Sequence, residues 1–314
     1  MTIVSPCEVF ELGFFKPGNT SGWYLGIWYK NVQNRTVVWV ANRDTPLSNS
    51  SGALLMTGNL VIKEGTENSQ TFFWQSFDYP THILLPDMKL GWNLSTGLNR
   101  YLTSWKSSED PTTGDFSIKL DYRGFPEIFL WHKHVKNFRT GPWNGMIFSG
   151  VPEMCASKHG VDFNFVTKQD EVYYSFSLQN KLELEYSGLA VSPNGDVQQI
   201  TWVESTKMWN IFQYAPKDQC DSYGECGPFG ICDTNASPVC KCVRGFQPKN
   251  LEAWNLGNGF DGCTRKRELK CTKDKFLRLR SVKLPESGGA FVNGDMSLEA
   301  CKEKCLENCL HCLL

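Results

Sequence analysis

Six cysteines between Cys220 and Cys263 constrain the fold of this chain more than any other feature of its sequence. Almost no aliphatic periodicity lies between them, so this short segment cannot bury enough apolar area to be held by a hydrophobic core. Disulfide bonds must hold it instead, and they indicate an oxidising compartment. Six thiols allow fifteen pairings, although Lys241 alone separates Cys240 from Cys242, which disfavours a bond between those two. A zinc site is the alternative, and we do not expect it because the spacing typical of zinc knuckles is absent.

The composition favours a β protein of several domains. The chain has 314 residues, enough for two or three domains, and a net charge of -1, so neither nucleic acid nor an anionic membrane is an expected partner. Its 11 tryptophans, 20 phenylalanines and 10 tyrosines lie in short runs broken by Gly, Asn, Asp and Pro, which is typical of strands. The total of 13 cysteines is odd, so at least one thiol is unpaired or bonds to another chain. The cysteines outside the cluster, whose pairing the sequence leaves open, are Cys7, Cys155, Cys271, Cys301, Cys305, Cys309 and Cys312.

Strand patterns recur along the first two thirds of the chain. Residues 9–15, 23–29 and 37–41 are aromatic and aliphatic runs, and the alternation in 23–29 predicts a strand that is covered on both faces. Residues 182–186 alternate between apolar and acidic side chains, which predicts a strand with one wet face. Asn194-Gly195 separates two apolar runs and predicts a β-hairpin.

Three sequence motifs, FELGFF, YLGIWYK and VVWVANRDTP, resemble the bulb-type lectin domain at the start of plant S-locus glycoproteins and S-domain (G-type lectin) receptor-like kinases. In mannose-binding bulb lectins a Gln, an Asp, an Asn and a Tyr, with a Val before the Tyr, grip the sugar from one strand face. The residues at these places here are Leu55, Thr57, Asn59, Val61 and Lys63. Only Asn59 and Val61 match the motif, and the carboxylate is missing. The chain also passes directly from Leu55 to the next unit, so we expect an internally shortened domain without a sugar site.

Further sequence motifs of the same family follow in order. The second lectin-like or S-locus glycoprotein region is resembled by four motifs between residues 85 and 153: LPDMKLGW, YLTSWKSSEDP, GPWNG and FSGVPE. The cysteine order resembles that of epidermal growth factor (EGF)-like modules. This resemblance implies the bonds Cys220–Cys232, Cys226–Cys240 and Cys242–Cys263. VKLPES, MSLEAC and CLENC resemble the start of a PAN/apple domain. Residues 276–280 there alternate as a strand, and Asp295 opens a helix with Ser297 as its N-cap.

We therefore expect a mainly β fold. It contains two tandem bulb-lectin-like β-prism regions, the first incomplete, then a small disulfide-rich EGF-like module and a partial PAN/apple domain with one helix. The expected boundaries are 1–80, 81–215, 216–263 and 264–314.

The sequence indicates an extracellular protein. Residues 1–7 lack the features of a signal peptide, and no run of about 18 apolar residues occurs. Because disulfide-type cysteines are present nonetheless, we expect a piece of a longer secreted or membrane-anchored protein, with the signal peptide and transmembrane helix missing. The N-glycosylation triplets begin at Asn19, Asn34, Asn49, Asn93 and Asn235.

No catalytic motif or cofactor site is evident. His132 and His134 flank Lys133 and could chelate a metal from one strand face, but no third ligand is near in the sequence, so no metal site is expected. Nucleophile elbows, metalloprotease helices and phosphate-binding glycine loops are absent from the sequence. We expect no cofactor and no enzyme activity in this chain; the kinase domain of full-length family members is absent from it.

The resemblance implies cell-surface recognition and signalling, including recognition of pollen in some members. The expected partners are a protein or peptide ligand and a second receptor ectodomain. We predict ligand contacts from two irregular loops, 131–139 and 153–159, because loops on a rigid β scaffold vary freely and aromatic or arginine anchors supply much binding energy. The candidate contact residues are Trp131, His134, Lys136, Phe138, Arg139, Lys158 and His159. The alternatives are a soluble mannose-type lectin and a hydrolytic enzyme.

We expect the chain not to bind mannose, because the carboxylate of the sugar motif is replaced. Isothermal titration calorimetry checks this, and binding at millimolar concentration or tighter would contradict it. Polar residues introduced at Leu55 and Thr57 should not create binding without the missing strands.

Overall fold

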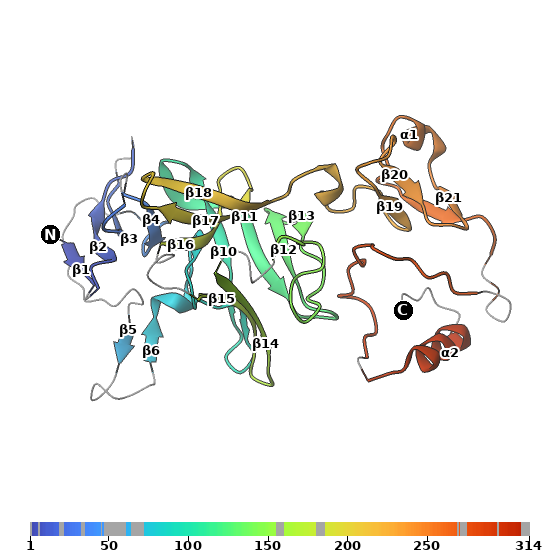
Figure 1. Ribbon diagram of the computed structural model, residues 1–314, viewed down its shortest axis with the longest axis horizontal. Coiled ribbons are helices and arrows are strands. Elements are labelled where there is room, and N and C mark those ends of the chain that lie inside the picture. Colours follow the sequence, from blue (N-terminus) through green and yellow to red (C-terminus); the bar gives the residue numbers. More distant parts are fainter. Residues whose placement is uncertain are drawn as a thin grey trace. The chain divides into compact units, whose positions relative to one another are not determined.

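The computed structural model describes residues 2–5, 7–18, 22–32, 35–44, 46, 61–63, 72–154, 160–179, 186–268, 270, 275–293 and 295–308. The described part is mainly β, as predicted (Figure 1). The chain divides into two compact units, which comprise residues 1–122 with 126–216 and residues 123–125 with 217–314. No helix of the described residues is long and apolar enough to cross a membrane.

The strands of the first unit are β1 Thr2–Val4, β2 Phe10–Phe15, β3 Tyr24–Tyr29, β4 Val37–Val40, β5 Val61–Lys63, β6 Phe72–Gln75, β7 Ile83–Leu84, β8 Leu90–Asn93, β9 Leu98–Arg100, β10 Leu102–Ser107, β11 Asp110–Asp121, β12 Glu127–His132, β13 Val135–Arg139, β14 Val161–Thr167, β15 Glu171–Leu178, β16 Ser187–Val191, β17 Val197–Val203 and β18 Met208–Ala215. The second unit contains β19 Gly230–Cys232, β20 Cys240–Cys242, β21 Phe246–Pro248, α1 Leu251–Asn255, β22 Cys263–Arg265 and α2 Leu298–Asn308. Short 3-10 helices lie at Ser76–Asp78 and Gln219–Asp221.

The first sheet has the strand order β1-β2-β3-β4, with all neighbours antiparallel. The predicted alternation in β3 is confirmed, because the two faces of this strand enter two different apolar clusters. Ile27 and Tyr29 belong to the main core of the unit, whereas Tyr24 and Trp28 pack with Phe15 in a smaller cluster on the other face. A strand that is apolar on both faces is thereby buried on both faces.

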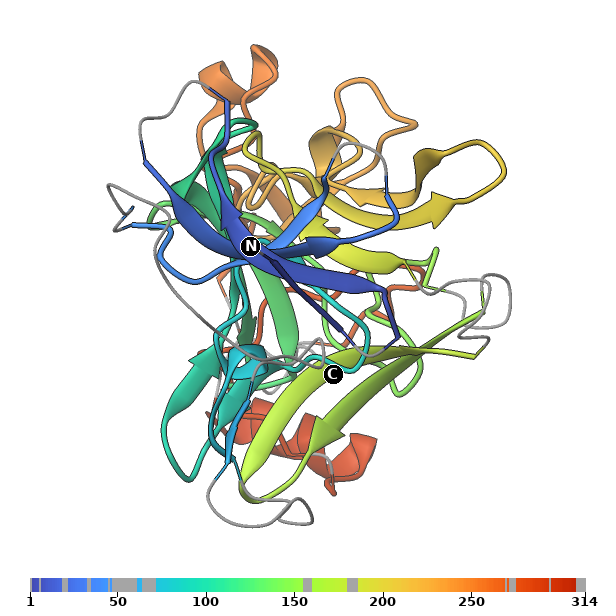
Figure 2. The ribbon, with the colours of Figure 1, turned by 90° about the vertical axis from the view of Figure 1, so that its left-hand side faces the viewer.

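Besides the two-stranded sheet β5-β6, the first unit contains three further four-stranded sheets, and these three surround a common interior (Figure 2). Their strand orders are β10-β11-β12-β13, β14-β15-β8-β9 and β18-β17-β16-β7. Each sheet turns an apolar face inward, so the three share one hydrophobic core, as the layer rule requires. This arrangement is the expected β-prism.

The predicted hairpin at Asn194-Gly195 is confirmed, and it joins β16 to β17 with Val191 paired to Val197. Gly195 has a φ of +88°, and a Cβ atom there would lie 2.5 Å from the Phe116 ring. Only glycine satisfies both conditions without strain. The strand predicted over residues 182–186 lies largely outside the described residues.

The first sheet and the prism share one core instead of forming two separate ones. The Tyr29 side chain enters the prism, where its hydroxyl donates to the Ser187 carbonyl at 3.2 Å and its ring packs edge-on against Tyr186. Trp209 lies against the same ring and donates to the Thr36 hydroxyl at 2.9 Å. The two lectin-like regions are therefore one folding unit.

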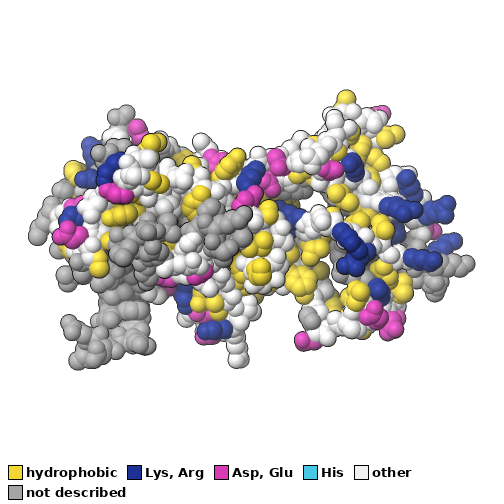
Figure 3. All heavy atoms as spheres, viewed as in Figure 1, with side chains coloured by type: hydrophobic (Ala, Val, Ile, Leu, Met, Phe, Trp, Pro, Cys, Tyr) yellow, Lys and Arg dark blue, Asp and Glu magenta, His cyan; other side chains and the backbone are white. Residues whose placement is uncertain are grey.

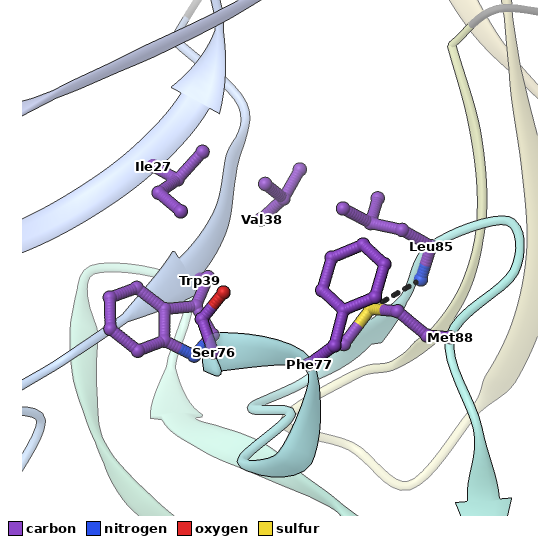
Figure 4. A pocket seen from close by; sticks show the side chains of 7 residues that line it. All are labelled: Ile27, Val38, Trp39, Ser76, Phe77, Leu85 and Met88. Carbon is purple, nitrogen blue, oxygen red and sulfur yellow. Dashed lines mark hydrogen bonds between the residues drawn. The ribbon is translucent and has the colours of Figure 1, made fainter. Parts of the chain in front are cut away.

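A small apolar pocket marks this junction. Its volume is about 10 Å³, and Ile27, Val38 and Trp39 of the first sheet form one side of it. Figure 4 shows Phe77 and Met88 lying across from Val38, with the Leu85 amide donating to the Met88 sulfur. The pocket has room for about one water molecule, so it is a packing gap and offers no ligand site.

Arg43 fastens the segment after β4 to the prism. Its guanidinium donates to the backbone carbonyls of Ser104 at 2.6 Å, Pro111 at 3.1 Å and Thr103 at 3.2 Å. The adjacent Asp44 accepts from the amide and hydroxyl of Thr113 at 2.8 and 2.7 Å. The NRD sequence thus acts as a clamp between the two lectin-like regions.

Disulfide bonds join Cys220 to Cys232, Cys226 to Cys240 and Cys242 to Cys263 in the second unit. The paired strands are short, at three residues each, so the crosslinks carry most of the tertiary connection here. Among the described cysteines, Cys7 and Cys301 are free thiols and Cys305 is disulfide-bonded.

The predicted N-cap of the last helix is confirmed, one other expectation for the second unit is wrong, and one short helix was not predicted. Helix α2 follows Ser297, whose hydroxyl accepts from the Ala300 amide at 3.2 Å. Residues 276–280 do not form a strand, because no described strand pairs with them and an unpaired strand leaves its backbone groups unsatisfied. The EGF-like module also contains a short helix that the sequence analysis missed, α1, capped by Asn250.

The Arg43 clamp should contribute measurably to stability. Replacing Arg43 with Met leaves three carbonyls without their charged donor, so we expect a loss of about 3 kcal/mol. This corresponds to a fall in Tm of roughly 5 to 10 °C in a unit of this size. Arg35, which lies 4.5 Å from the centroid of the Trp28 ring, provides the matched control. The clamp is refuted if Arg35→Met and Arg43→Met lower Tm equally.

His82 should make the first unit sensitive to acid. Burial lowers its pKa to about 3, and the charge of Arg43 acts in the same direction. Below about pH 6.5 the unfolded chain takes up a proton that the folded chain does not, so stability falls between about pH 6.5 and 3, by at most about 1.4 kcal/mol per pH unit.

The variant His82→Gln tests this by urea unfolding at several pH values. We expect a flatter stability profile than in the wild type over that range. The same substitution at the exposed His134 shows whether loss of any histidine has this effect. Parallel profiles for the wild type and His82→Gln would contradict the assignment.

Candidate functional site

The segment 131–139, predicted as an irregular contact loop, is a tight β-hairpin. Strands β12 and β13 pair antiparallel, with one register shift between Leu130 and Trp131, and are joined by the two residues Lys133 and His134. Lys133 has a φ of +55° and its amide donates to the Asp115 carbonyl at 2.6 Å. The prediction of an irregular loop is wrong because both strands satisfy their backbone groups in the sheet with β11.

One half of the hairpin belongs to the core, so two predicted contact residues are wrong. Phe138 is 3% exposed and packs inside the prism. Arg139 lies in a largely buried ion pair, with its Nη1 atom 3.1 Å from an oxygen of Glu127. Glu127 is 2% exposed, and a buried carboxylate requires such a partner. Neither Phe138 nor Arg139 can anchor a ligand without breaking the core.

The other half of the hairpin faces solvent. Val135 is 69% exposed. The Lys136 ammonium lies 4.2 Å from the centroid of the Phe129 ring and 5.5 Å from that of Trp131. These rings hold the cation on one face of the sheet. Val135 is the neighbouring residue of the same strand and points to the other face. The sequence analysis did not name Val135, although an aliphatic residue inside the polar run HKHVKN was a signal for it.

The histidines of the hairpin do not form a metal site with other described residues. The His132 ring stacks on Phe116 with centroids 4.6 Å apart. The one group of three metal-ligating side chains found among the described residues is Cys226, Cys232 and Cys240, and disulfide bonds already occupy these sulfurs.

Several predicted site residues lie outside the described part of the chain. They are Lys158 and His159 of the second contact loop, Asn59 of the mannose motif, and the glycosylation triplets at Asn19, Asn34 and Asn49. Val61 lies in β5, of which only the backbone is described. Of the remaining triplets, Asn235 is exposed in the disulfide-rich module, and Asn93 is partly buried at the end of β8.

Three family models match successive parts of the chain. The D-mannose binding lectin model matches residues 49–106, the S-locus glycoprotein domain matches 138–250 and the PAN-like domain matches 270–313. The S-locus-specific glycoprotein S6 of Brassica oleracea is 44% identical over an alignment that covers 98% of this chain and 78% of that protein. The chain belongs to the S-locus glycoprotein family. This membership agrees with the resemblance seen in the sequence.

Receptor kinases are relatives of the same S-locus glycoprotein family. The receptor-like serine/threonine-protein kinase SD1-8 of Arabidopsis thaliana is 49% identical, and the alignment covers 98% of this chain but only 40% of the kinase. The chain thus spans less than half the length of that relative. This alignment extends over 345 positions, more than the 314 residues of the chain, so the relative has residues without a counterpart here.

Proposed function

We propose that this chain is an extracellular recognition region that binds a protein or peptide ligand through the exposed half of the β12–β13 hairpin. The observation that carries the proposal is the exposure of the aliphatic side chain of Val135 near the tip of a well-ordered hairpin, next in sequence to a cation held on aromatic rings, Lys136. Protein interfaces combine an apolar centre with a polar rim, and the exposed half of the hairpin offers both kinds of side chain. The hairpin is continuous with the prism core, so little ordering cost would accompany binding.

The ligand surface would be acidic or amide-rich around an apolar centre. Lys133 and Lys136 place two cations near the tip, although the Lys133 ammonium lies 3.3 Å from a carboxylate oxygen of Asp115. A second receptor ectodomain is a further proposed partner, because a ligand that bridges two ectodomains would bring the kinases of two full-length receptors together. Recognition of pollen is one proposed setting for such signalling.

We propose an extracellular location and no catalysis for this chain. Three disulfide bonds support a location outside the cell, and the exposed Asn235 is accessible for glycosylation. We propose no catalysis for this chain, because the family comprises glycoproteins and the relatives' kinase activity belongs to proteins of which this chain matches a part. We also retain the domain boundaries 1–80, 81–215, 216–263 and 264–314 as a proposal.

A mannose-binding lectin is the second candidate function. The match to the D-mannose binding lectin model favours it. The replaced side chains at Leu55 and Thr57 argue against it, since neither carries the carboxylate that the sugar motif requires.

Photo-crosslinking tests the proposed surface directly. The chain is secreted from plant cells with a photo-reactive phenylalanine analogue at Val135 and is exposed to cell-surface proteins. We expect a specific adduct from Val135 and none from the same analogue at Ile211, which is 46% exposed on β18. Equal labelling from both positions would show that the hairpin is not a binding surface.

Substitutions separate binding from stability. The double variant His134→Ala/Lys136→Ala should weaken binding to the captured partner about tenfold or more with little change in Tm, since a hot-spot side chain commonly contributes about 2 kcal/mol. The variant Phe138→Ala should instead lower stability by about 3 to 5 kcal/mol, because it opens a cavity in the core. A Tm loss in the double variant without a specific loss of binding would assign the hairpin to the scaffold.

A further inference from the structure

The prism interior contains a cavity of about 60 Å³ that no step of the proposed function uses. Each of the three sheets contributes to its wall, through residues such as Leu130 of β12, Tyr174 of β15 and Val197 of β17. The segment between β13 and β14 closes it with Phe148 and Val151. The cavity exceeds the roughly 10 to 15 Å³ that one water molecule needs, so it can accept a larger group.

A single buried amide is the unusual feature of this wall. Gln199 of β17 lines the cavity and is 2% exposed. Its Nε2 atom is buried and has no hydrogen-bond partner among the described residues. Buried polar groups in folded proteins are almost always hydrogen-bonded, and an orphaned donor lowers stability. An aliphatic side chain of the same size would avoid this cost, so the amide is best explained by an occupant that accepts its proton.

The rest of the wall determines the chemistry of that occupant. No charged side chain lines the cavity, and burial raises the pKa of Tyr174 so that its phenol stays neutral. The Thr140 hydroxyl is already engaged, because it accepts from the Ile128 amide and donates to the Gly141 carbonyl at 3.0 Å in each case. An ion would therefore be unstabilised here, whereas an uncharged apolar molecule with one acceptor would be matched.

The cavity has a route to solvent beside β18. Tyr214 lines it and is 50% exposed, and its neighbours Gln213 and Ala215 are partly buried. A ligand can therefore enter past the edge of this strand without unfolding the prism. A longer molecule could also insert only its end.

We propose that the β-prism binds a small, uncharged, mainly apolar molecule whose single carbonyl or ether oxygen accepts a hydrogen bond from Gln199 Nε2. This site is independent of the proposed hairpin surface, because Val135, His134 and Lys136 do not line the cavity. Failure of one proposal leaves the other intact.

Two matched probes test the site in the whole chain. Cyclopentanone carries the required oxygen, and methylenecyclopentane has nearly the same shape with a CH₂ group in place of that oxygen. Binding of each is measured by ligand-observed NMR titration and by the shift in Tm. We expect the ketone to bind about tenfold more tightly than the hydrocarbon.

The variant Gln199→Leu should abolish this preference and should raise the Tm of the ligand-free protein, because it replaces an unsatisfied amide by an apolar side chain. The variant Gln213→Leu is the matched control, since Gln213 pairs with Gln199 across β17 and β18 but is only partly buried. It should retain the preference for the ketone.

Three outcomes would overturn the proposal. They are no binding of either probe at millimolar concentration, equal affinity for both probes in the wild type, and a preference that survives Gln199→Leu. Ordered water alone in the cavity would appear as the first of these. If Gln199→Leu does not fold, the comparison of the two probes on the wild-type chain still decides the question.

Discussion

The first unit depends on the closure of three sheets around one interior. Each sheet is apolar on the face that it turns inward, and none could expose that face to water. Leu84, Leu90 and Phe176 come from different sheets or positions along the chain, yet all three are 0% exposed. The first sheet contributes to the same interior through Tyr29 of β3, whose ring packs against Trp209 of β18. Loss of closure would expose the whole set at once, which makes the two lectin-like regions a cooperative pair.

The second unit contrasts with the first, because disulfide bonds and not a hydrophobic core stabilise its cysteine-rich module. Its disulfide-rich module has few aliphatic side chains, and three crosslinks limit the freedom of the unfolded chain in place of a core. Farther along, large apolar side chains remain at the surface, with Leu277 51% and Phe291 69% exposed. Figure 3 shows basic and apolar side chains together on the visible face of this unit. Residues 266–267 and 270 are exposed members of the basic run that leads into it.

Polar groups inside the first unit fall into two kinds. Arg43 and Glu127 meet partners that compensate for their burial. Arg43 thereby joins segments that are distant in sequence, and Glu127 joins the two strands of one hairpin. Gln199 donates from Nε2 to no described residue although it is almost fully buried. Evolution rarely retains an uncompensated donor for stability alone, since an aliphatic replacement would be neutral or better.

The sequence by itself determined local structure wherever one short-range signal dominated. The alternation in residues 23–29, the turn at Asn194-Gly195 and the cap at Ser297 each depend on neighbours within a few residues, and each is confirmed. The sequence motifs shared with S-locus glycoproteins indicated the family of the chain, because long matches in the right order rarely arise by chance. Tertiary structure decided the rest. Phe138 and Arg139 were predicted as surface anchors, but the pairing of β13 with β12 places Phe138 in the core and Arg139 in an ion pair with Glu127. Residues 276–280 had strand periodicity but no described partner strand. The cavity and its orphaned amide could not be predicted at all, because they exist only where three sheets from distant parts of the chain meet.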